Sequence, residues 1–329
     1  MQKDTMRAVV QNAYGPPSEL RERRIPVPTP GDGEVLVRVR AAGVDAGTWH
    51  LTTGRPYLMR LMGFGWRGPK ARVRGLAFAG EVEAVGTGNP TVPWHVGDPV
   101  FGSADGALAE FVVAKSTGLV RIPDGIGQVE AAAIPISAVT ALQAMDAAAP
   151  SPSDHILVIG AAGGVGHFAV QLAVARGARV TGVCSGPKAD LVRSLGVEEV
   201  VDYTTMDILT SGRRFDAIID TAGNRPLSAL RRILSPTGTV VLVGGEAGGP
   251  LLGGIQRTMV ASLLDRFTRQ HLVGLIAHER QQDLETLAGL LADGTLRPVI
   301  DTVYPLEQTA EAVEHIGAGR ARGKVVVTL

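Results

Sequence analysis

A run of glycine and small residues follows an apolar stretch, residues 156–159, near the middle of the 329-residue chain. The run reads Gly160, Ala161, Ala162, Gly163, Gly164, Val165 and Gly166. Its glycines permit a tight turn, let the backbone approach a phosphate and let the next helix pack closely on the strand. That helix, expected over 165–176, presents free N–H groups and its positive end to an anion. The spacing therefore predicts a binding turn for a dinucleotide pyrophosphate.

The residues after this turn alternate between strand-like and helix-like patterns. Strands are expected at 179–183, 199–202, 215–220 and 239–243, and helices at 188–195 and 227–234. This alternation is typical of a doubly wound parallel sheet of the Rossmann type. Ala162 stands where the second glycine of G-x-G-x-x-G usually falls, and a glycine-rich turn can exist without a ligand. The order of strand, turn, helix and second strand favours the binding interpretation.

The end of the second strand indicates which dinucleotide is bound. An NAD site needs an acid there to accept hydrogen bonds from the ribose 2′-hydroxyl. Here Ser185 and Lys188 follow the strand, and no acid occurs before Asp190. A serine hydroxyl and an ammonium suit a 2′-phosphate, and Tyr203 after the next strand adds a phenolic donor. The sequence predicts NADPH as cofactor, while Lys188 as a plain exposed helix residue is the alternative.

The first third of the chain has short alternating strands separated by Gly and Pro. Strands are expected at 35–40, 79–86 and 109–113, with a turn entering a strand over 96–102. This pattern of short strands and turns predicts a compact β-barrel-like domain. An Ala-rich helix is then expected over 131–148, ended by Pro150 and Pro152. Near the C-terminus the pattern predicts a helix over 306–316 and a strand over 323–329.

Residues 55–74, called the basic loop below, carry basic residues and no acid. Tyr57, Phe64 and Trp66 are interspersed among them. The loop is interpreted either as a solvated surface segment with apolar anchors or as a lid or phosphate-facing edge. The first interpretation is favoured because runs of like charge are usually solvated.

Composition excludes several classes of protein. Hydrophobic residues make up 45% of the chain and charged residues 19%, as in a globular protein. Lys plus Arg and Asp plus Glu both number 32, so we expect no nucleic-acid partner. No apolar stretch has the length of a membrane span, and the first six residues do not resemble a signal peptide. The single cysteine, Cys184, excludes an internal disulfide. We therefore expect a cytoplasmic protein without a membrane partner.

Several motifs together resemble the zinc-free quinone oxidoreductase branch of the medium-chain dehydrogenase/reductase superfamily. They are Ala41-Ala42-Gly43-Val44-Asp45, Glu83-Ala84-Val85-Gly86, Val96-Gly97-Asp98-Pro99-Val100, the turn up to Gly166, and Ala321-Arg322-Gly323-Lys324-Val325-Val326-Val327. The resemblance implies an α/β protein with a GroES-like β-barrel domain over 1–128 and a Rossmann domain over 129–295, and it implies that residues 296–329 complete the first domain. It also implies a cofactor cleft between the domains and a homodimer.

The resemblance also implies further residues of this chain that contact the cofactor. Thr140 corresponds to a threonine that meets the nicotinamide side of the cofactor, and Arg320 resembles the arginine that closes on the 2′-phosphate. Arg322 and Lys324 are alternatives to Arg320. Four more residues follow expected strands at the carboxyl edge of the sheet, where ligands bind in such folds: Asp220, Gly223, Gly244 and Gly245.

The positions that hold zinc in related enzymes are occupied differently here. Zinc-dependent members carry a catalytic Cys at the position of Asp45 and a His-Glu pair where this chain has Gly75-Leu76-Ala77. The four-cysteine structural lobe is missing. The seven histidines, at 50, 95, 155, 167, 271, 278 and 315, are scattered without metal-ligand spacing. We predict that the protein uses no metal.

Without a Lewis acid, hydride transfer is favoured to acceptors that delocalise the developing charge. The leading hypothesis is reduction of a small-molecule quinone or α,β-unsaturated carbonyl by NADPH. Asp45, His50 and Tyr57 are the catalytic candidates, as proton donors or orienting groups. Asp45 can equally be a turn-capping carboxylate, and His50 a packed or exposed histidine. A zinc-free aldehyde or alcohol dehydrogenase and a non-catalytic NADPH-binding sensor or interaction protein are the alternatives.

Overall fold

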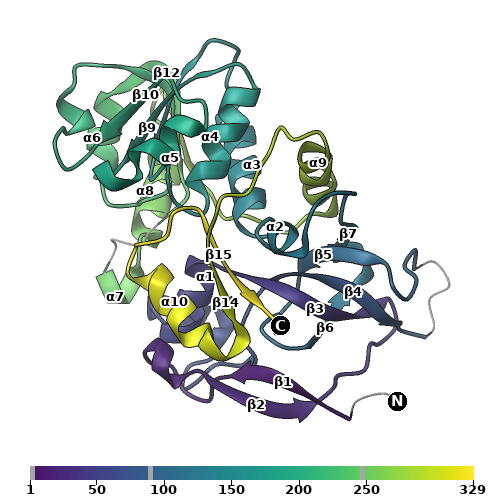
Figure 1. Ribbon diagram of the computed structural model, residues 1–329. Helices are drawn as coiled ribbons and strands as arrows, with labels where there is room; N and C mark the ends of the chain where they lie inside the picture. The colour runs from purple at the N-terminus through teal and green to yellow at the C-terminus, as the bar shows by residue number, and fades with distance from the viewer. Residues whose placement is uncertain (1–3, 88–91, 245–248) are drawn as a thin grey trace. The chain divides into compact units, whose positions relative to one another are not determined.

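The computed structural model describes residues 4–87, 92–244 and 249–329, which belong to two compact units (Figure 1). Unit 1 comprises Met1–Val139 and Glu279–Leu329, and unit 2 comprises Thr140–His278. The domain ends expected from the sequence, at 128 and 295, stay predictions, whereas the compact units change at Val139 and at His278. The difference arises because α2 (Gln128–Ala132) packs on strands β3 and β4 of unit 1 and α9 (Gln281–Ala292) packs on β7.

Unit 1 is built on a mainly antiparallel sheet in which the two ends of the chain meet. Its strand order is β14-β15-β3-β4-β5-β7, with β6 also paired to β3 and with β1 and β2 forming a separate two-stranded sheet. Strand β15 (Lys324–Thr328) runs antiparallel to β3 (Glu34–Val44), with Val325 opposite Val44. The C-terminal strand therefore completes the sheet that the N-terminal part begins. Its inward side chains, including Val37, Phe78 and Val327, form one core cluster.

The remaining strands of unit 1 are β1 Thr5–Val10, β2 Arg21–Pro26, β4 Ala77–Val85, β5 Pro99–Ser103, β6 Phe111–Lys115, β7 Leu119–Arg121 and β14 Ile300–Pro305. Its other helices are α1 Ala46–Thr53 and α10 Thr309–Gly317, and α3 Ser137–Ala148 begins in unit 1 and continues into unit 2. Short helical turns are η1 Pro17–Glu19, η2 Arg60–Phe64, η3 Ser116–Gly118 and η6 Leu306–Gln308.

Unit 2 is a parallel six-stranded sheet with the order β10-β9-β8-β11-β12-β13 among the described residues. Every neighbouring pair runs parallel. This is the 3-2-1-4-5-6 order of a Rossmann sheet, whose topology reverses beside the first strand. The sheet core gathers buried aliphatic and aromatic side chains such as Leu157, Phe215 and Val240. Continuous apolar strands such as β8 fit a sheet covered on both faces.

The strands of unit 2 are β8 His155–Ile159, β9 Arg179–Cys184, β10 Glu199–Asp202, β11 Phe215–Asp220, β12 Leu234–Leu242 and β13 His271–Gly274. Its helices are α4 Gly166–Ala175, α5 Ala189–Ser194, α6 Leu227–Arg232, α7 Gly249–Leu252 and α8 Ile255–Asp265, with short turns η4 Gly186–Lys188 and η5 Ile208–Thr210.

The helix expected over 131–148 was wrong as one element. Two helices, α2 and α3, occupy this region, and residues 133–136 between them are not helical. The break occurs at Pro135. Proline lacks an N–H for the helix and disfavours a helical conformation in the residue before it. The break places Ser137 at the start of α3, where it becomes part of the site in unit 1.

A half-buried histidine makes the stability of unit 2 depend on pH. His155 Nε2 lies 2.8 Å from the Thr181 hydroxyl, and burial is the main cause that lowers the pKa of His155 below 6.5. The unfolded chain then binds a proton that the folded chain does not, so stability present above pH 6.5 is lost as the pH falls toward the folded pKa. We predict that His155→Gln has a smaller loss of unfolding free energy between about pH 7.5 and about pH 5 than the wild type, measured by urea denaturation. Equal losses in the two proteins would contradict this.

Candidate functional site

The glycine-rich turn of unit 2 leaves no room for side chains at two of its positions. Gly160 has φ +83°, and a Cβ there would lie 2.4 Å from the Thr221 hydroxyl oxygen. A Cβ on Gly166 would lie 2.0 Å from the Gly160 carbonyl oxygen, so helix α4 starts directly against the end of β8. Gly163 has more room, since its nearest atom would be 3.2 Å away. The turn therefore has the tight geometry that its sequence predicts.

The middle of the turn is open to a ligand. Gly163, Gly164 and Val165 are half-buried, whereas Ala161, Ala162 and Gly166 are buried. His167, which the sequence did not single out, fixes this shape from inside, because its Nδ1 lies 2.8 Å from the Gly163 carbonyl oxygen and donates to it. The backbone of the open residues lies at the N-terminus of α4, where an anion is stabilised by the helix dipole.

The residues expected to bind the 2′-phosphate gather at the ends of β9 and β10. Ser185 and Lys188 follow β9, and Tyr203 follows β10 with its N–H bonded to the Cys184 carbonyl at 3.1 Å. The sequence reasoning missed Asp202, the last residue of β10. Hydrogen bonds from the N–H and hydroxyl of Thr204 and from the N–H of Gly186 lower the pKa of Asp202, so its carboxylate is ionised at neutral pH. This charge bears on the choice between NADPH and NADH.

Asp220 holds the carboxyl end of β11 together instead of lying open at the edge. It is fully buried; its Oδ1 accepts from the Gly223 N–H at 3.0 Å and its Oδ2 from Arg257 Nη2 at 2.7 Å. Gly244 lies alongside, since a Cβ there would be 2.2 Å from the Thr221 carbonyl oxygen. The predicted cofactor contacts of Asp220, Gly223 and Gly244 stay predictions, and Gly245 lies outside the described residues.

The buried N–H groups of Arg257 indicate whether the residues of unit 2 fit a dinucleotide. Its Nε and Nη1 are buried and have no hydrogen-bond partner in the described part of the chain. Buried donors without partners are costly, and they are satisfied when a ligand oxygen binds. Arg257 lies at the same carboxyl edge as Gly223, through its bond to Asp220. The open turn and these donors fit the phosphates and hydroxyls of a dinucleotide, although no motif of the sequence pointed to Arg257.

Unit 1 contains a buried charge cluster around Asp45. Asp45 is 7% exposed, and its Oδ1 accepts from the Thr48 N–H at 2.9 Å, which caps helix α1. Its Oδ2 is buried and has no hydrogen-bond partner among the described residues. Lys324 lies across the sheet, one residue beyond the pair of Val325 and Val44. The capping interpretation of Asp45 is therefore right for one oxygen, and the second oxygen faces a different environment.

Lys324 is 1% exposed and donates from Nζ to the Ser137 hydroxyl at 2.8 Å. Burial lowers the pKa of the Lys324 ammonium, and the negative charge of Asp45 partly offsets this effect. A buried lysine needs a negative partner to keep its charge. Asp45, Lys324 and Ser137 therefore form one cluster that joins the ends of β3, β15 and the start of α3. The alternative that Lys324 takes the place of Arg320 at the cofactor stays a prediction.

The other two catalytic candidates lie on or just after α1. His50 Nδ1 donates to the Arg55 carbonyl oxygen at 2.8 Å, and the His50 ring is half-buried. Tyr57 is exposed, with the Arg60 guanidinium over its ring at 4.7 Å. No hydrogen bond joins the described side chains of Asp45, His50 and Tyr57. Their catalytic roles stay predictions.

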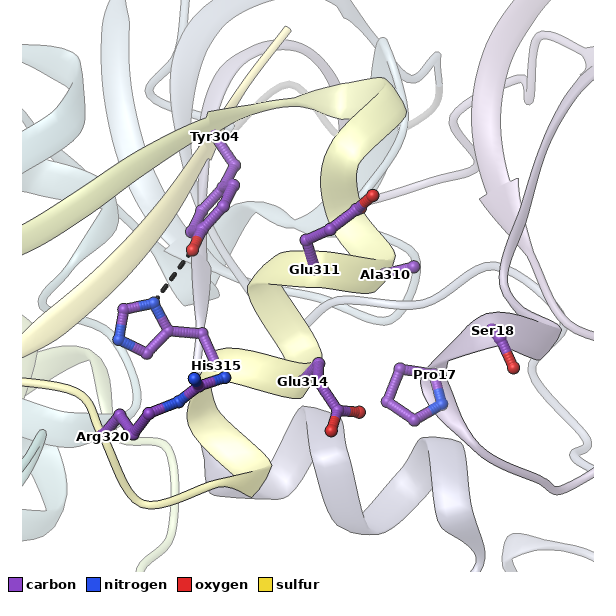
Figure 2. A pocket seen from close by; sticks show the side chains of 8 residues that line it. All are labelled: Pro17, Ser18, Tyr304, Ala310, Glu311, Glu314, His315 and Arg320. Carbon is purple, nitrogen blue, oxygen red and sulfur yellow. Dashed lines mark hydrogen bonds between the residues drawn. The ribbon is translucent and has the colours of Figure 1, made fainter.

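Arg320 and Thr140 lie in different units. Arg320 lines a cavity of about 540 Å³ in unit 1, beside His315 (Figure 2). His315 joins Tyr304 and Asp301 in a hydrogen-bonded row, with Tyr304 Oη 2.9 Å from Nδ1 and Asp301 Oδ2 3.0 Å from Nε2. Thr140 is half-buried on α3 in unit 2. The contacts predicted for these two residues stay predictions.

Two family models match the chain. Residues 31–124 match the alcohol dehydrogenase GroES-like domain, and residues 195–327 match the zinc-binding dehydrogenase family. The chain is 32% identical to a chloroplast envelope quinone oxidoreductase homolog of Arabidopsis thaliana, over 98% of both chains. This chain belongs to the medium-chain dehydrogenase/reductase superfamily. The expected α/β fold, with a GroES-like domain and a parallel Rossmann sheet, is confirmed.

Two further relatives of this medium-chain oxidoreductase bear on its chemistry. It is 31% identical to a trans-enoyl reductase of Aspergillus terreus, covering 91% of this chain and 87% of the relative. A mycobacterial protein solved in complex with NADPH superimposes with a TM-score of 0.81 at 27% identity, covering 98% of this chain and all of the other. Members of the superfamily bind a nicotinamide cofactor and act on small molecules, so the chain is an oxidoreductase of this type.

The described residues contain neither a cluster of metal-ligating side chains nor a helix that could span a membrane. No three His, Cys, Asp or Glu side chains gather there as a metal site would require. No helix in that part of the chain has both the length and the apolar character to cross a bilayer.

The contact between Gly166 and Gly160 predicts how a single methyl group affects cofactor binding. In Gly166→Ala the new Cβ would overlap the Gly160 carbonyl oxygen at 2.0 Å, which forces the turn to open. We expect NADPH to bind at least about tenfold more weakly, measured by calorimetry. Gly289→Ala is the matched control, because a Cβ there in helix α9 meets nothing within 4 Å. Unchanged affinity in Gly166→Ala would contradict the binding turn.

The buried cluster predicts a coupling between Asp45 and Lys324. Lys324→Met leaves the Asp45 carboxylate buried without its partner charge and should cost about 3 kcal/mol of unfolding free energy. Asp45→Asn keeps an oxygen for the Thr48 N–H but removes the charge. We expect the double variant to be at least about 1 kcal/mol more stable than the sum of the single effects, measured by urea denaturation. Effects that simply add would show that the two charges do not interact.

Proposed function

We propose that the protein is a zinc-independent reductase that transfers a hydride from NADPH to a quinone or an α,β-unsaturated carbonyl compound. The quinone oxidoreductase and trans-enoyl reductase relatives support this substrate class. Both kinds of acceptor spread the developing negative charge over a conjugated system, so they need less help from a Lewis acid than an isolated ketone does.

The pairing of Asp45 with Lys324 is the observation that carries the zinc-independent reaction. Asp45 stands where zinc-dependent members carry their catalytic cysteine. Here one oxygen caps α1 and the carboxylate lies near a buried ammonium. Asp45 interacts electrostatically with Lys324, and a positive charge on this lysine would disfavour a second cation at the same place. The substitution at Gly75-Leu76-Ala77, where related enzymes carry a His-Glu pair, supports the same conclusion.

Polar groups at the ends of β9 and β10 favour NADPH over NADH. Ser185, Lys188 and Tyr203 supply a hydroxyl, an ammonium and a phenol for a 2′-phosphate. Asp202 is an acid at the end of β10, and its oxygens already accept hydrogen bonds from Gly186 and Thr204. It therefore does not play the part of the free carboxylate that accepts from a ribose 2′-hydroxyl in NAD sites.

Bound NADPH would supply the hydride. Residues of this chain would hold the cofactor and donate a proton to the substrate. The turn from Gly160 to Gly166 would bind the pyrophosphate, and the free N–H groups of Arg257 would bind a further cofactor oxygen. His50 carries its neutral-ring proton on Nδ1, which is bonded to the Arg55 carbonyl, so Nε2 donates only when the ring is protonated. The exposed hydroxyl of Tyr57 is the second candidate donor.

A homodimer and a cytoplasmic location belong to the same proposal. Strand β13 lies at an edge of the described part of the parallel sheet, and an edge strand is a surface on which a second sheet can continue. The neutral overall charge and the dependence on a soluble cofactor support a cytoplasmic location.

A panel of acceptors tests the proposed reaction. Purified protein is mixed with NADPH and either quinones, enones or simple aldehydes, and the loss of NADPH absorbance is followed. We expect turnover with quinones or enones and slower turnover with aldehydes, unchanged by a chelator. Faster reduction of aldehydes would favour an alcohol dehydrogenase without zinc. NADPH binding without turnover of any acceptor would favour a non-catalytic sensor.

The cofactor preference depends on Lys188. Lys188→Gln removes one positive charge from the expected 2′-phosphate site and should weaken NADPH binding about tenfold, because hydrogen bonds between charged groups are the strong ones. NADH lacks that phosphate, so its affinity should not change. Calorimetric titration with each cofactor measures both effects. Equal weakening of NADPH and NADH would contradict a 2′-phosphate contact at Lys188.

A further inference from the structure

The basic loop, residues 55–74, exposes large apolar side chains to solvent. Leu61, Met62, Phe64 and Trp66 have exposed fractions of 67%, 61%, 44% and 65%. Single exposed apolar residues are common on protein surfaces, but these four lie within six positions of the chain, and a concentration of this kind is typical of an interaction surface. Nothing in the proposed reaction uses these four side chains.

Positive charges surround this apolar patch. The basic residues of the loop are Arg55, Arg60, Arg67, Lys70, Arg72 and Arg74, and the loop contains no acid. Arg55, Arg67, Lys70 and Arg72 are exposed, while Arg74 is buried. The whole chain carries no net charge, so this concentration of positive charge is local. The patch is therefore complementary to a negatively charged partner that also accepts apolar side chains.

The backbone of the loop is held by hydrogen bonds at Phe64 and near Gly54, so the exposed side chains are presented in a fixed shape. The Tyr14 hydroxyl donates to the Phe64 carbonyl oxygen at 2.8 Å, and the Lys70 N–H donates to the same oxygen at 3.1 Å. Arg60 donates from Nε to the Gly54 carbonyl at 2.9 Å and lies over the Tyr14 ring at 4.4 Å. Ordering the exposed side chains on a bound surface then costs little additional backbone entropy.

We propose that the basic loop docks the protein on the surface of an anionic lipid bilayer. Leu61, Met62, Phe64 and Trp66 would enter the boundary between headgroups and acyl chains, and tryptophan is favoured at this depth. Arg55, Arg67, Lys70 and Arg72 would lie among the anionic headgroups. This contact is peripheral, so it is compatible with the lack of a spanning helix in the described residues. It differs from the expectation, drawn from the sequence, that the protein has no membrane partner.

The residue types favour lipid over the other partners of a basic surface. Single-stranded nucleic acid stacks its bases on aromatic rings, but it offers nothing to the aliphatic side chains of Leu61 and Met62. A second copy of this chain would have to place the same unbalanced positive charges against each other, because the twofold contact uses one patch twice. A bilayer satisfies the apolar and the charged residues together.

Co-sedimentation of the full chain with vesicles tests the proposal. The vesicles contain phosphatidylcholine alone or phosphatidylcholine with about 30 mol% phosphatidylglycerol. We expect binding to the anionic vesicles at about 50 mM NaCl, little binding to the neutral ones, and release at about 500 mM NaCl. Absence of binding to anionic vesicles at low salt would overturn the proposal. The result does not depend on cofactor or turnover, so it stands apart from the proposed reaction.

Matched variants assign the binding to the loop. Each basic residue near an anionic surface contributes about fivefold, so the triple variant Arg67→Gln, Lys70→Gln, Arg72→Gln should bind about hundredfold more weakly. The control removes three exposed arginines of unit 2, through Arg193→Gln, Arg266→Gln and Arg269→Gln, and should bind like the wild type. All six side chains are exposed, and an unchanged melting temperature confirms the fold. Equal losses in the two triple variants would overturn the assignment to the loop.

Insertion of Trp66 gives a second and independent measurement. Lipids brominated along the acyl chain quench a tryptophan that enters the bilayer, so we expect quenching in the wild type and its loss in Trp66→Phe. Trp49 and Trp94, which are partly buried against the core of unit 1, remain as internal references. Binding of RNA by the patch would overturn the proposal. The proposal would also be overturned if Leu61→Ser dissociated a dimer in sedimentation experiments but left vesicle binding unchanged.

Discussion

An electrostatic interaction between two buried ionisable groups, Asp45 and Lys324, links distant parts of the chain. Lys324 begins the last strand, Asp45 follows the third, and Ser137 starts the helix that leads into the parallel-sheet unit. An ammonium inside a protein is tolerated only with a carboxylate and a hydrogen-bond acceptor close to it. The C-terminal strand, the cap of α1 and the start of α3 must therefore be in place at the same time. The same pairing directs the proposed chemistry away from zinc.

A second constraint is steric and acts in the parallel-sheet unit. The backbone of Gly160 and that of Gly166 approach so closely that only glycine fits at the second position. This contact sets the start of α4 against β8 and leaves the backbone between them open to a phosphate. The ends of β9, β10 and β11 lie along the carboxyl edge of the same sheet, which is why residues far apart in sequence form one candidate cofactor surface.

Residues with strong local signals were predictable from the sequence. The presence of a parallel sheet and the tight shape of the glycine turn follow from apolar runs and glycine spacing, and the capping role of Asp45 was one of two stated interpretations. The partner of Asp45 was not predictable, because Lys324 is 279 positions away and only the strand register brings them together. Arg257 and Asp202 were missed for a related reason, since their roles depend on hydrogen bonds made across the sheet edge. Pro135 is a residue that ends helices, but the helical spacing of apolar residues on both sides of it led to the prediction of one continuous helix.

Transfer of a labelled hydride tests the central claim most directly. The protein is incubated with an α,β-unsaturated carbonyl compound and NADPH deuterated at C4 of the nicotinamide, separately for each face of the ring, and the product is analysed by mass spectrometry and NMR. The account predicts one deuterium at the β-carbon of the product, from one face only and without added metal. Tight binding of NADPH with no deuterium in any product, or transfer only to a simple carbonyl carbon, would contradict it.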